Sequence, residues 1–134
     1  MWLIGPSVRP GGWLFLFEPE LHFGADVLVP DIAGWRRERM AAIPNAPWSE
    51  LAPDWLCETL SPSTANIDRT RKLRIYAREG ARNVWLVDPI QRTLEVLALD
   101  GGRWVVAENH GGNEPVRATP FAAVEIPLAR LWID

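Results

Sequence analysis

The sequence has one cysteine and no long apolar run, and these two features exclude a disulfide-rich protein and a membrane-spanning helix. Cys57 alone cannot form an internal disulfide, which fits a reducing cytosol. No apolar run approaches the ~20 residues that a membrane-spanning helix needs. The opening MWLIGPSVRP is not a convincing signal peptide, because no basic region precedes a long apolar stretch there. We therefore predict a cytoplasmic protein without a membrane partner.

Excess positive charge is also missing. The formal net charge at pH 7 is −3, which argues against attraction of the whole protein to nucleic acid. Basic residues are nevertheless concentrated at 68–82 and in a short cluster formed by Arg36, Arg37 and Arg39. Two interpretations stay open: these are solvated surfaces of an arginine-rich chain, or Arg36, Arg37 and Arg69 contact the phosphates of a nucleic acid.

The chain is long enough for one ordinary domain with a real core. It has 134 residues, of which 48% are hydrophobic, and it shows no internal repeat or linker. We therefore treat residues 1–134 as a single domain. Apolar β-rich runs predict strands at 13–18, 27–34, 55–60, 83–88, 93–99 and 103–108, with a short strand near Val116.

The connections between these strands define the predicted fold. The first two strands are expected to form a meander, followed by a long loop at 35–52. One main helix is predicted over 66–79, ending at Gly80, and a short helix at 127–132. Strands on both sides of one crossover helix predict an α/β fold of the mixed α+β kind, with a twisted mixed sheet.

Two carboxylates occupy predicted strands that are otherwise apolar. Alternation places Glu58 on the same strand face as two leucines, where an unpaired carboxylate is costly. Asp31 follows Pro30 in the run VLVPDIAG, where a bulge can direct its side chain into a cleft. The structural alternatives are an ion pair or a wet strand edge for Glu58, and for Asp31 an ordinary turn of the kind that Pro53-Asp54 predicts.

Lys72 is the single lysine among 14 basic residues. On a helical wheel it lies at the flank of the buried face, one turn from Tyr76 and away from the arginines. An ammonium group is a movable point charge that can orient a water or stabilise a developing oxyanion. The alternative is the chance survival of one lysine in an arginine-biased chain.

Asp31, Glu58 and Lys72 together suit hydrolysis assisted by a divalent metal. Carboxylate oxygens would hold a hard cation such as Mg²⁺ or Mn²⁺, which keeps several waters. One of those waters would attack a phosphodiester beside the lysine. Residue type and predicted placement support this hypothesis, and spacing alone does not compel it.

Two segments, VLVPDIAGWRRERM and APDWLCETLSPSTANIDRTRKLRIYAREGARNVWLVDPIQRTLEVL, resemble the Uma2 family of endonucleases in the PD-(D/E)XK superfamily. The most specific part is ETLSPST, followed by Asp68, Lys72 and Tyr76 and then by VWLVDP. The resemblance implies a restriction-endonuclease-like fold, in which Asp31 and Glu58 bind the metal. Leu60 stands where the motif lysine normally stands, and in such families the lysine can come from the next helix, which matches Lys72.

The chain departs from this family at its beginning. Members usually have an N-terminal helix that can supply another acidic residue, and here the chain starts almost at the first predicted strand. Glu18 or Glu20 is a candidate substitute, and the uncovered apolar surface would favour a homodimer. Tyr76 and Asp68 are further supporting candidates.

Two functions therefore remain open. The first is a metal-dependent endonuclease that hydrolyses DNA phosphodiester bonds. The alternative is a truncated, non-catalytic member of the fold that binds nucleic acid or protein.

Overall fold

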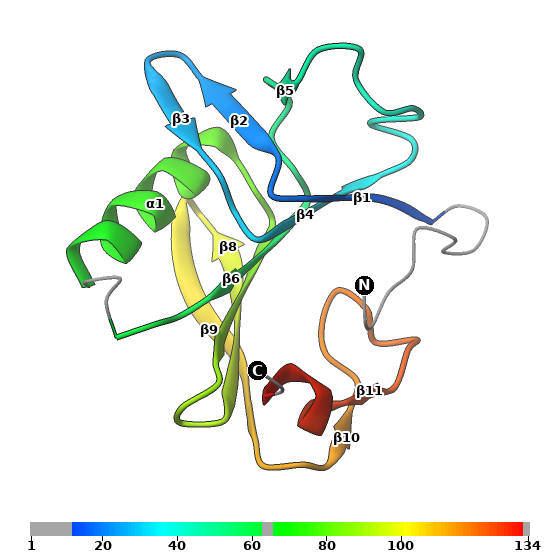
Figure 1. Cartoon of the computed structure of the whole chain (residues 1–134), viewed down its shortest axis with the longest axis vertical. Coiled ribbons are helices and arrows are strands. Elements are labelled where there is room, and N and C mark those ends of the chain that lie inside the picture. Colours follow the sequence, from blue (N-terminus) through cyan, green and yellow to red (C-terminus); the bar gives the residue numbers. More distant parts are fainter. Residues whose placement is uncertain (1–11, 63–65, 133–134) are drawn as a thin grey trace.

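A six-stranded mixed sheet runs through the part of the chain that the computed structural model describes, residues 12–62 and 66–132, without the side chains of 66–68 (Figure 1). The strands β6 and β7 are parallel, and every other neighbouring pair is antiparallel. The spatial order is β1 (Trp13–Phe17), β4 (Ile32–Arg36), β6 (Trp55–Thr59), β7 (Asn83–Asp88), β8 (Thr93–Asp100) and β9 (Arg103–Gly111).

The helix α1 (Asn66–Glu79) connects the parallel strands β6 and β7, as a parallel pair requires a crossover. It ends at the predicted glycine. Gly80 has a φ of +84°, and its N–H donates to the Ala77 carbonyl at 3.1 Å. The Ala81 N–H donates to the Tyr76 carbonyl, also at 3.1 Å, which completes a Schellman motif. The sequence therefore stops this helix by backbone geometry that glycine adopts without strain.

The segment before β6 is more divided than predicted. The expected strand 27–34 breaks at Pro30 into β3 (Asp26–Leu28) and β4, because proline cannot donate to a sheet ladder. The expected antiparallel pairing of the first two predicted strands is present between β1 and β4, and the finding that differs is an inserted hairpin of β3 with β2 (Glu20–Phe23). The predicted loop 35–52 begins inside β4 and contains β5 (Trp48–Ser49), which adds to β2 in parallel.

Alternation along the strands builds two cores, one on each face of the large sheet. The first face is covered by α1 and by the small sheet β3-β2-β5, and buries residues such as Leu56 and Tyr76. The second is an aromatic core in which Trp55 and Trp85 meet Phe121 edge-on, with ring centroids 5.0 and 5.6 Å away. It is covered by the C-terminal elements β10 (Pro115–Val116), β11 (Ile126–Pro127) and the 3-10 helix η1 (Leu128–Trp132).

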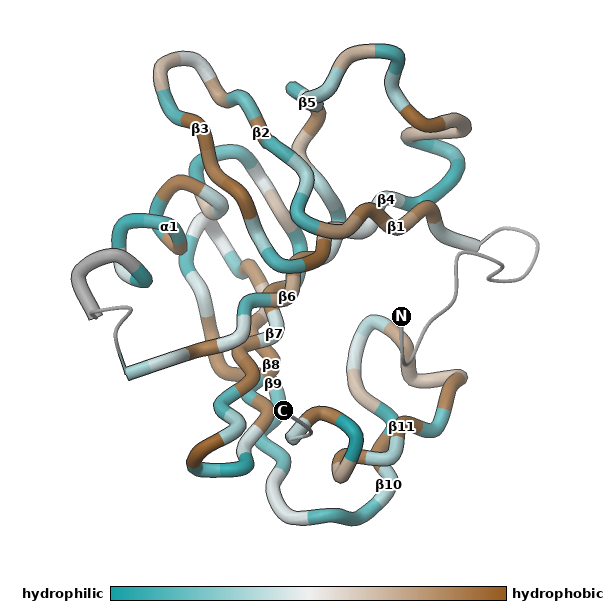
Figure 2. The backbone as a smooth tube through the Cα atoms, viewed as in Figure 1, coloured by the Kyte–Doolittle hydropathy of each residue, from teal (hydrophilic) through white to brown (hydrophobic). Residues whose placement is uncertain are grey.

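Hydrophobic stretches follow β1, β3 and the strands at the centre of the molecule, as Figure 2 shows. Within the described ranges, no helix is long and apolar enough to cross a membrane. The short predicted strand near Val116 and the short C-terminal helix are present as β10 and η1. The mixed α+β fold with one main crossover helix is confirmed.

Candidate active site

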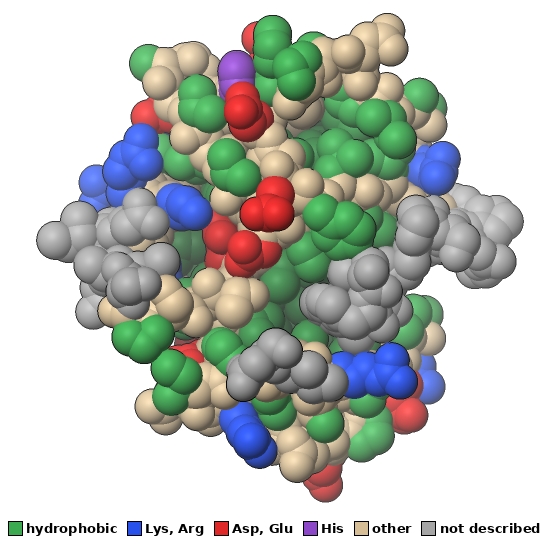
Figure 3. Space-filling view, in the orientation of Figure 1, with side chains coloured by type: hydrophobic (Ala, Val, Ile, Leu, Met, Phe, Trp, Pro, Cys, Tyr) green, Lys and Arg blue, Asp and Glu red, His purple; other side chains and the backbone are tan. Residues whose placement is uncertain are grey.

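Asp31 and Glu58 meet across neighbouring antiparallel strands. In the pairing of β4 with β6, Ile32 stands opposite Cys57, and Asp31, the residue before β4, lies beside the end of β6, where it accepts a hydrogen bond from Thr59 and acts on the charge of Glu58. Ile32 and Cys57 face the aromatic core. Alternation along β6 therefore turns Glu58 to the face that α1 covers. Figure 3 shows acidic side chains gathered near the middle of the molecule, where β1, β4 and β6 meet in Figure 1.

The Asp31 carboxylate is fixed by the end of β6. The backbone N–H of Thr59 donates to Asp31 Oδ2 at 2.6 Å. This bond holds one oxygen of the carboxylate against the strand that presents Glu58. Sequence patterns gave no signal for it, because a backbone N–H is the same at every non-proline position.

Glu58 receives two hydrogen bonds from α1, and both end on the same oxygen. The Tyr76 hydroxyl donates to Glu58 Oε2 at 2.9 Å, and Lys72 Nζ donates to the same oxygen at 3.3 Å. The side chains are mostly covered, with 13% of Glu58 and 23% of Lys72 exposed. Tyr76 is fully buried. The helix thus orients Glu58 so that Oε1 is the oxygen that neither Lys72 nor Tyr76 contacts.

The surroundings of Glu58 disfavour its ionised form and so raise its pKa. Burial raises the pKa of Glu58 above its ordinary value, and the negative charge of Asp31 acts in the same direction. The charge of Lys72 and the hydrogen bond from Tyr76 oppose this rise in pKa without cancelling it. A buried carboxylate that faces a second carboxylate is stabilised by binding a cation, so the pair fits a cation site.

A small cavity adjoins Glu58 and Lys72. Its volume is about 40 Å³, and leucines from β7, α1 and the end of β6 form much of its wall. The cavity is large enough for a water molecule and has polar groups to bind one. Its lining residues are Glu58, Thr59, Leu60, Arg69, Lys72, Leu73, Tyr76 and Leu86.

The donor set fits a hard divalent cation held by few protein ligands. Among the described residues, no group of three or more histidine, cysteine or acidic side chains is placed to hold a metal ion. Asp31 and Glu58 would supply one oxygen each, which suits Mg²⁺ or Mn²⁺ because these ions keep several waters. Softer metals are disfavoured, since Cys57 points to the opposite face of β6.

Cys57 is chemically inert in this position. Burial raises the pKa of its thiol far above the ordinary value, and the charges of Asp31 and Glu58 add to the effect. The thiol therefore stays protonated, and a protonated thiol is neither a metal ligand nor a nucleophile.

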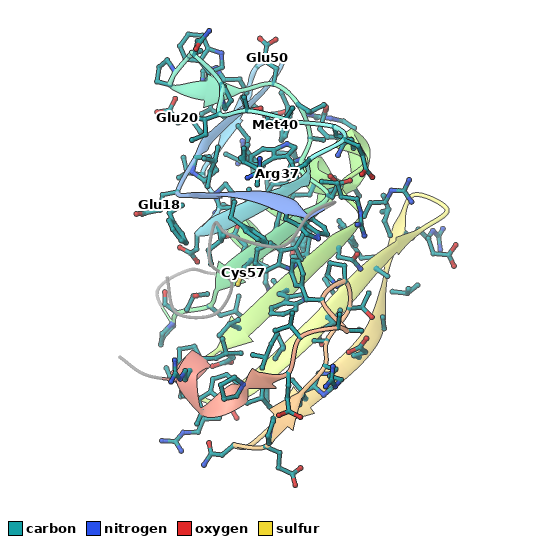
Figure 4. All side chains as sticks on the ribbon, turned by 90° about the vertical axis from the view of Figure 1, so that its right-hand side faces the viewer. Glu18, Glu20, Arg37, Met40, Glu50 and Cys57 are labelled. Atoms are coloured by element: carbon teal, nitrogen blue, oxygen red, sulfur yellow. The ribbon has the colours of Figure 1, made fainter. Side chains whose placement is uncertain are left out.

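The other predicted acidic residues are not gathered at this pair. The Glu18 N–H donates to the Asp31 carbonyl at 2.9 Å, so its backbone adjoins the site, while its side chain is exposed. Glu20 accepts a hydrogen bond from His22 at 3.0 Å instead. Figure 4 shows Glu18 and Glu20 projecting from one side of the molecule. Asp68 lies in the first turn of α1, and its side chain is outside the described structure.

The predicted phosphate contacts divide into two places. Arg69 lines the cavity beside Lys72. Arg36 is at the far end of β4, on the other face of the sheet, with its Cζ 4.6 Å from the centroid of the Trp13 ring. Arg37 follows it and is exposed. Contact of Arg36 and Arg37 with nucleic acid stays a prediction from the sequence.

Together, the mixed sheet and its crossover helix define an α+β domain of the kind found in a solved "putative nuclease". The Uma2 family, described as "Putative restriction endonuclease", matches residues 2–129, and the chain belongs to this family. A solved "putative nuclease belonging to DUF820" from Anabaena variabilis has a similar fold, with a TM-score of 0.73 and 23% identity over 91% of this chain and 69% of that one. No curated protein matches the sequence. The predicted family is thereby confirmed.

Proposed function

We propose that this protein is a metal-dependent endonuclease that hydrolyses DNA phosphodiester bonds. The family and the fold support nuclease function in general. The observation that carries the proposal is the half-buried Glu58 carboxylate, which lies close enough to Asp31 for that charge to raise its pKa and has both donors from α1 on a single oxygen. A carboxylate placed only for structure would be expected to have both oxygens satisfied.

The roles of the side chains follow from their positions. Asp31 and Glu58 would hold Mg²⁺ or Mn²⁺, and such a cation would supply a more acidic water as the nucleophile. Tyr76 keeps Glu58 oriented while the ammonium group of Lys72 moves between Glu58 and the reacting phosphate. There Lys72 orients the attacking water or stabilises the charge that develops on the phosphate. Arg69, at the rim of the same cavity, contacts a phosphate oxygen of the substrate.

The non-catalytic alternative predicts carboxylates that diverge or are capped by arginines. Within the described residues Glu58 is hydrogen-bonded to a lysine and a tyrosine, and Asp31 to a backbone N–H. The charge of Asp31 also acts on Glu58, which places the two carboxylates near each other. These observations favour the catalytic proposal. The cytoplasmic location and the homodimer stay predictions from the sequence.

The test combines metal binding with cleavage. Isothermal titration of Mg²⁺ and of Mn²⁺ into the wild type and Glu58→Ala should show binding that disappears in the variant. Plasmid nicking by the wild type should need the metal and should be lost in Lys72→Ala. Glu125→Ala, an exposed carboxylate on the C-terminal segment, is the matched control and should behave as the wild type. A folded wild type that binds neither metal would overturn the catalytic proposal.

A further inference from the structure

Trp48 is an exposed tryptophan in a protein that buries most of its tryptophans. Its exposed fraction is 39%, whereas Trp35, Trp55 and Trp85 are fully buried. The indole N–H groups of Trp35 and Trp85 also donate to backbone carbonyls, at 3.0 and 2.7 Å. Those rings therefore have evident structural roles, and the exposed ring of Trp48 needs a different explanation.

The ring of Trp48 is held in a fixed orientation. It stacks on the imidazole of His22 with the ring centroids 4.9 Å apart and the planes 5° from parallel. His22 is in turn bonded to Glu20 at 3.0 Å, and Glu20 pairs with Trp48 between β2 and β5. Because Leu21 is buried against the core, alternation puts these three side chains together on the outer face of the small sheet. Glu20 thus positions an imidazole here.

This stack lies near the carboxylate pair. Glu20 is two residues beyond Glu18, and the Glu18 N–H is bonded to the Asp31 carbonyl. Adding the strand spacings along this route puts Trp48 at most roughly 17 Å from Asp31 between Cα atoms. Figure 4 shows Glu18 and Glu20 on the same side of the molecule. A nucleic-acid strand at Asp31 therefore reaches Trp48 within a few nucleotides.

The chemistry of the surface selects a base over a phosphate. Glu20, which is exposed and pairs with Trp48, repels a phosphodiester next to the ring, and Glu50, two residues along the chain from Trp48, is exposed as well. The flat apolar face of the indole suits the face of a nucleobase, and such stacking tolerates any base sequence. In a paired duplex the base faces are already stacked, so the ligand is an unpaired base. We infer that Trp48, supported by His22, is a stacking site for an unpaired nucleobase of the substrate strand. This inference rests on the proposed nuclease function.

Binding of a labelled single-stranded oligonucleotide, followed by fluorescence anisotropy with the metal chelated, tests the inference without cleavage. Trp48→Ala should weaken binding about fivefold or more, the loss expected for one stacked base. Trp48→Phe should retain binding within about threefold, because phenylalanine still offers an aromatic face. Ile43→Ala removes an apolar side chain that is 68% exposed in the same region and should leave binding unchanged.

A second readout separates stacking from a structural role of the ring. A series of oligonucleotides, each with one abasic position, locates the base that stacks on Trp48. Removing that base should weaken binding to the wild type as much as Trp48→Ala weakens binding of the intact strand. The oligonucleotide without that base should bind the wild type and Trp48→Ala equally. Equal binding of wild type and Trp48→Ala, or an equal loss in Ile43→Ala, would overturn the inference. Plasmid nicking by the same samples tests the proposed nuclease function independently. If the wild type nicks plasmid and Trp48→Ala binds the oligonucleotide normally, only the stacking inference is overturned. If Trp48→Ala weakens binding and the wild type does not nick plasmid, only the nuclease proposal is overturned.

Discussion

Two largely covered carboxylates, Asp54 and Glu58, stand at opposite ends of β6, and their partners differ. Asp54, just before the strand, binds Arg39 through Oδ1 at 2.9 Å and the Arg36 N–H through Oδ2 at 2.8 Å. Glu58 is the second-last residue of the same strand, and both of its hydrogen-bond donors from α1 bind Oε2. The exposed fractions of the two side chains, 9% and 13%, are almost the same.

Burial therefore does not distinguish Asp54, which has a structural role, from Glu58, for which we propose a catalytic one. Asp54 has an ion pair on one oxygen and a hydrogen bond on the other, so groups of the protein itself stabilise its negative charge. Glu58 faces a second carboxylate, and its pKa is raised by burial and by that neighbour. How the donors are distributed over the two oxygens distinguishes the residues, and four substitutions test this difference.

The largest effect is expected in catalysis. Asp31→Asn keeps an acceptor for the Thr59 N–H but removes a metal-binding charge, so metal-dependent cleavage should fall at least about 1,000-fold, or ~4 kcal/mol. Asp54→Asn, assayed at a temperature where it is folded, should stay within about threefold of the wild type. Initial rates of plasmid nicking measure both. Equal losses in the two variants would remove the distinction between the two ends of β6.

The next effect is on stability. Asp54→Ala leaves the Arg36 N–H and the Arg39 guanidinium without their carboxylate, and should cost about 2–3 kcal/mol in the free energy of unfolding. Urea denaturation measures it. Asp100→Ala, at an exposed turn, is the control and should change stability by less than about 0.5 kcal/mol. A loss for Asp54→Ala no larger than that of the control would show that Asp54 is not structural.

A smaller effect is expected from Tyr76→Phe. This change removes a hydrogen bond that lowers the pKa of Glu58, so that pKa should rise further. Because a metal would bind the ionised carboxylate, Mg²⁺ affinity should fall about three- to tenfold at pH values below the raised folded pKa of Glu58 and approach the wild-type value as the pH rises above it. Calorimetric titration at each pH measures it. An equal loss at every pH would mean that Tyr76 acts through packing.

The smallest effect is a gain in stability from Glu58→Gln. A raised pKa means that the folded state holds the Glu58 proton more tightly than the unfolded state, whose value is near 4.5. The resulting stabilisation is present below that pH and is lost as the pH rises through the folded pKa. Near neutral pH, Gln should therefore raise the Tm by a few degrees, and the gain should vanish at acidic pH. Asp54→Asn should lower the Tm at neutral pH, and a Glu58→Gln variant that also lowered it would contradict the comparison.

The half of the fold after residue 55 was predictable because its signals are local. Alternating apolar residues mark β6 to β9, and Gly80 marks the end of α1. The earlier half was predicted poorly, since β1 pairs with β4 across an inserted hairpin and no periodicity records a distant partner. Pro30 indicated that the apolar run 27–34 is interrupted, but it did not indicate that β3 belongs to a separate sheet.

The candidate site was predictable in its members and not in its contacts. The position of Lys72 on the flank of the buried helix face indicated that it reaches the sheet, and it contacts Glu58. The direct bond from Tyr76 to Glu58 was not foreseen, because tyrosine was expected to support the lysine or to pack in the core. The role of Asp54 was missed for a similar reason: it depends on Arg39, which lies 15 residues away in a segment expected to be a loop.

The buried Cys57 has a practical consequence for labelling experiments. As the one cysteine in the chain, it leaves the folded surface without a reactive thiol, so Ile43→Cys would take up a single dye at an exposed position. Cys57 itself would react only when β6 separates from its neighbours. The rate at which Cys57 is modified therefore measures how often β6, the strand that contains Glu58, opens. A cation bound to both Asp31 and Glu58 should lower that rate.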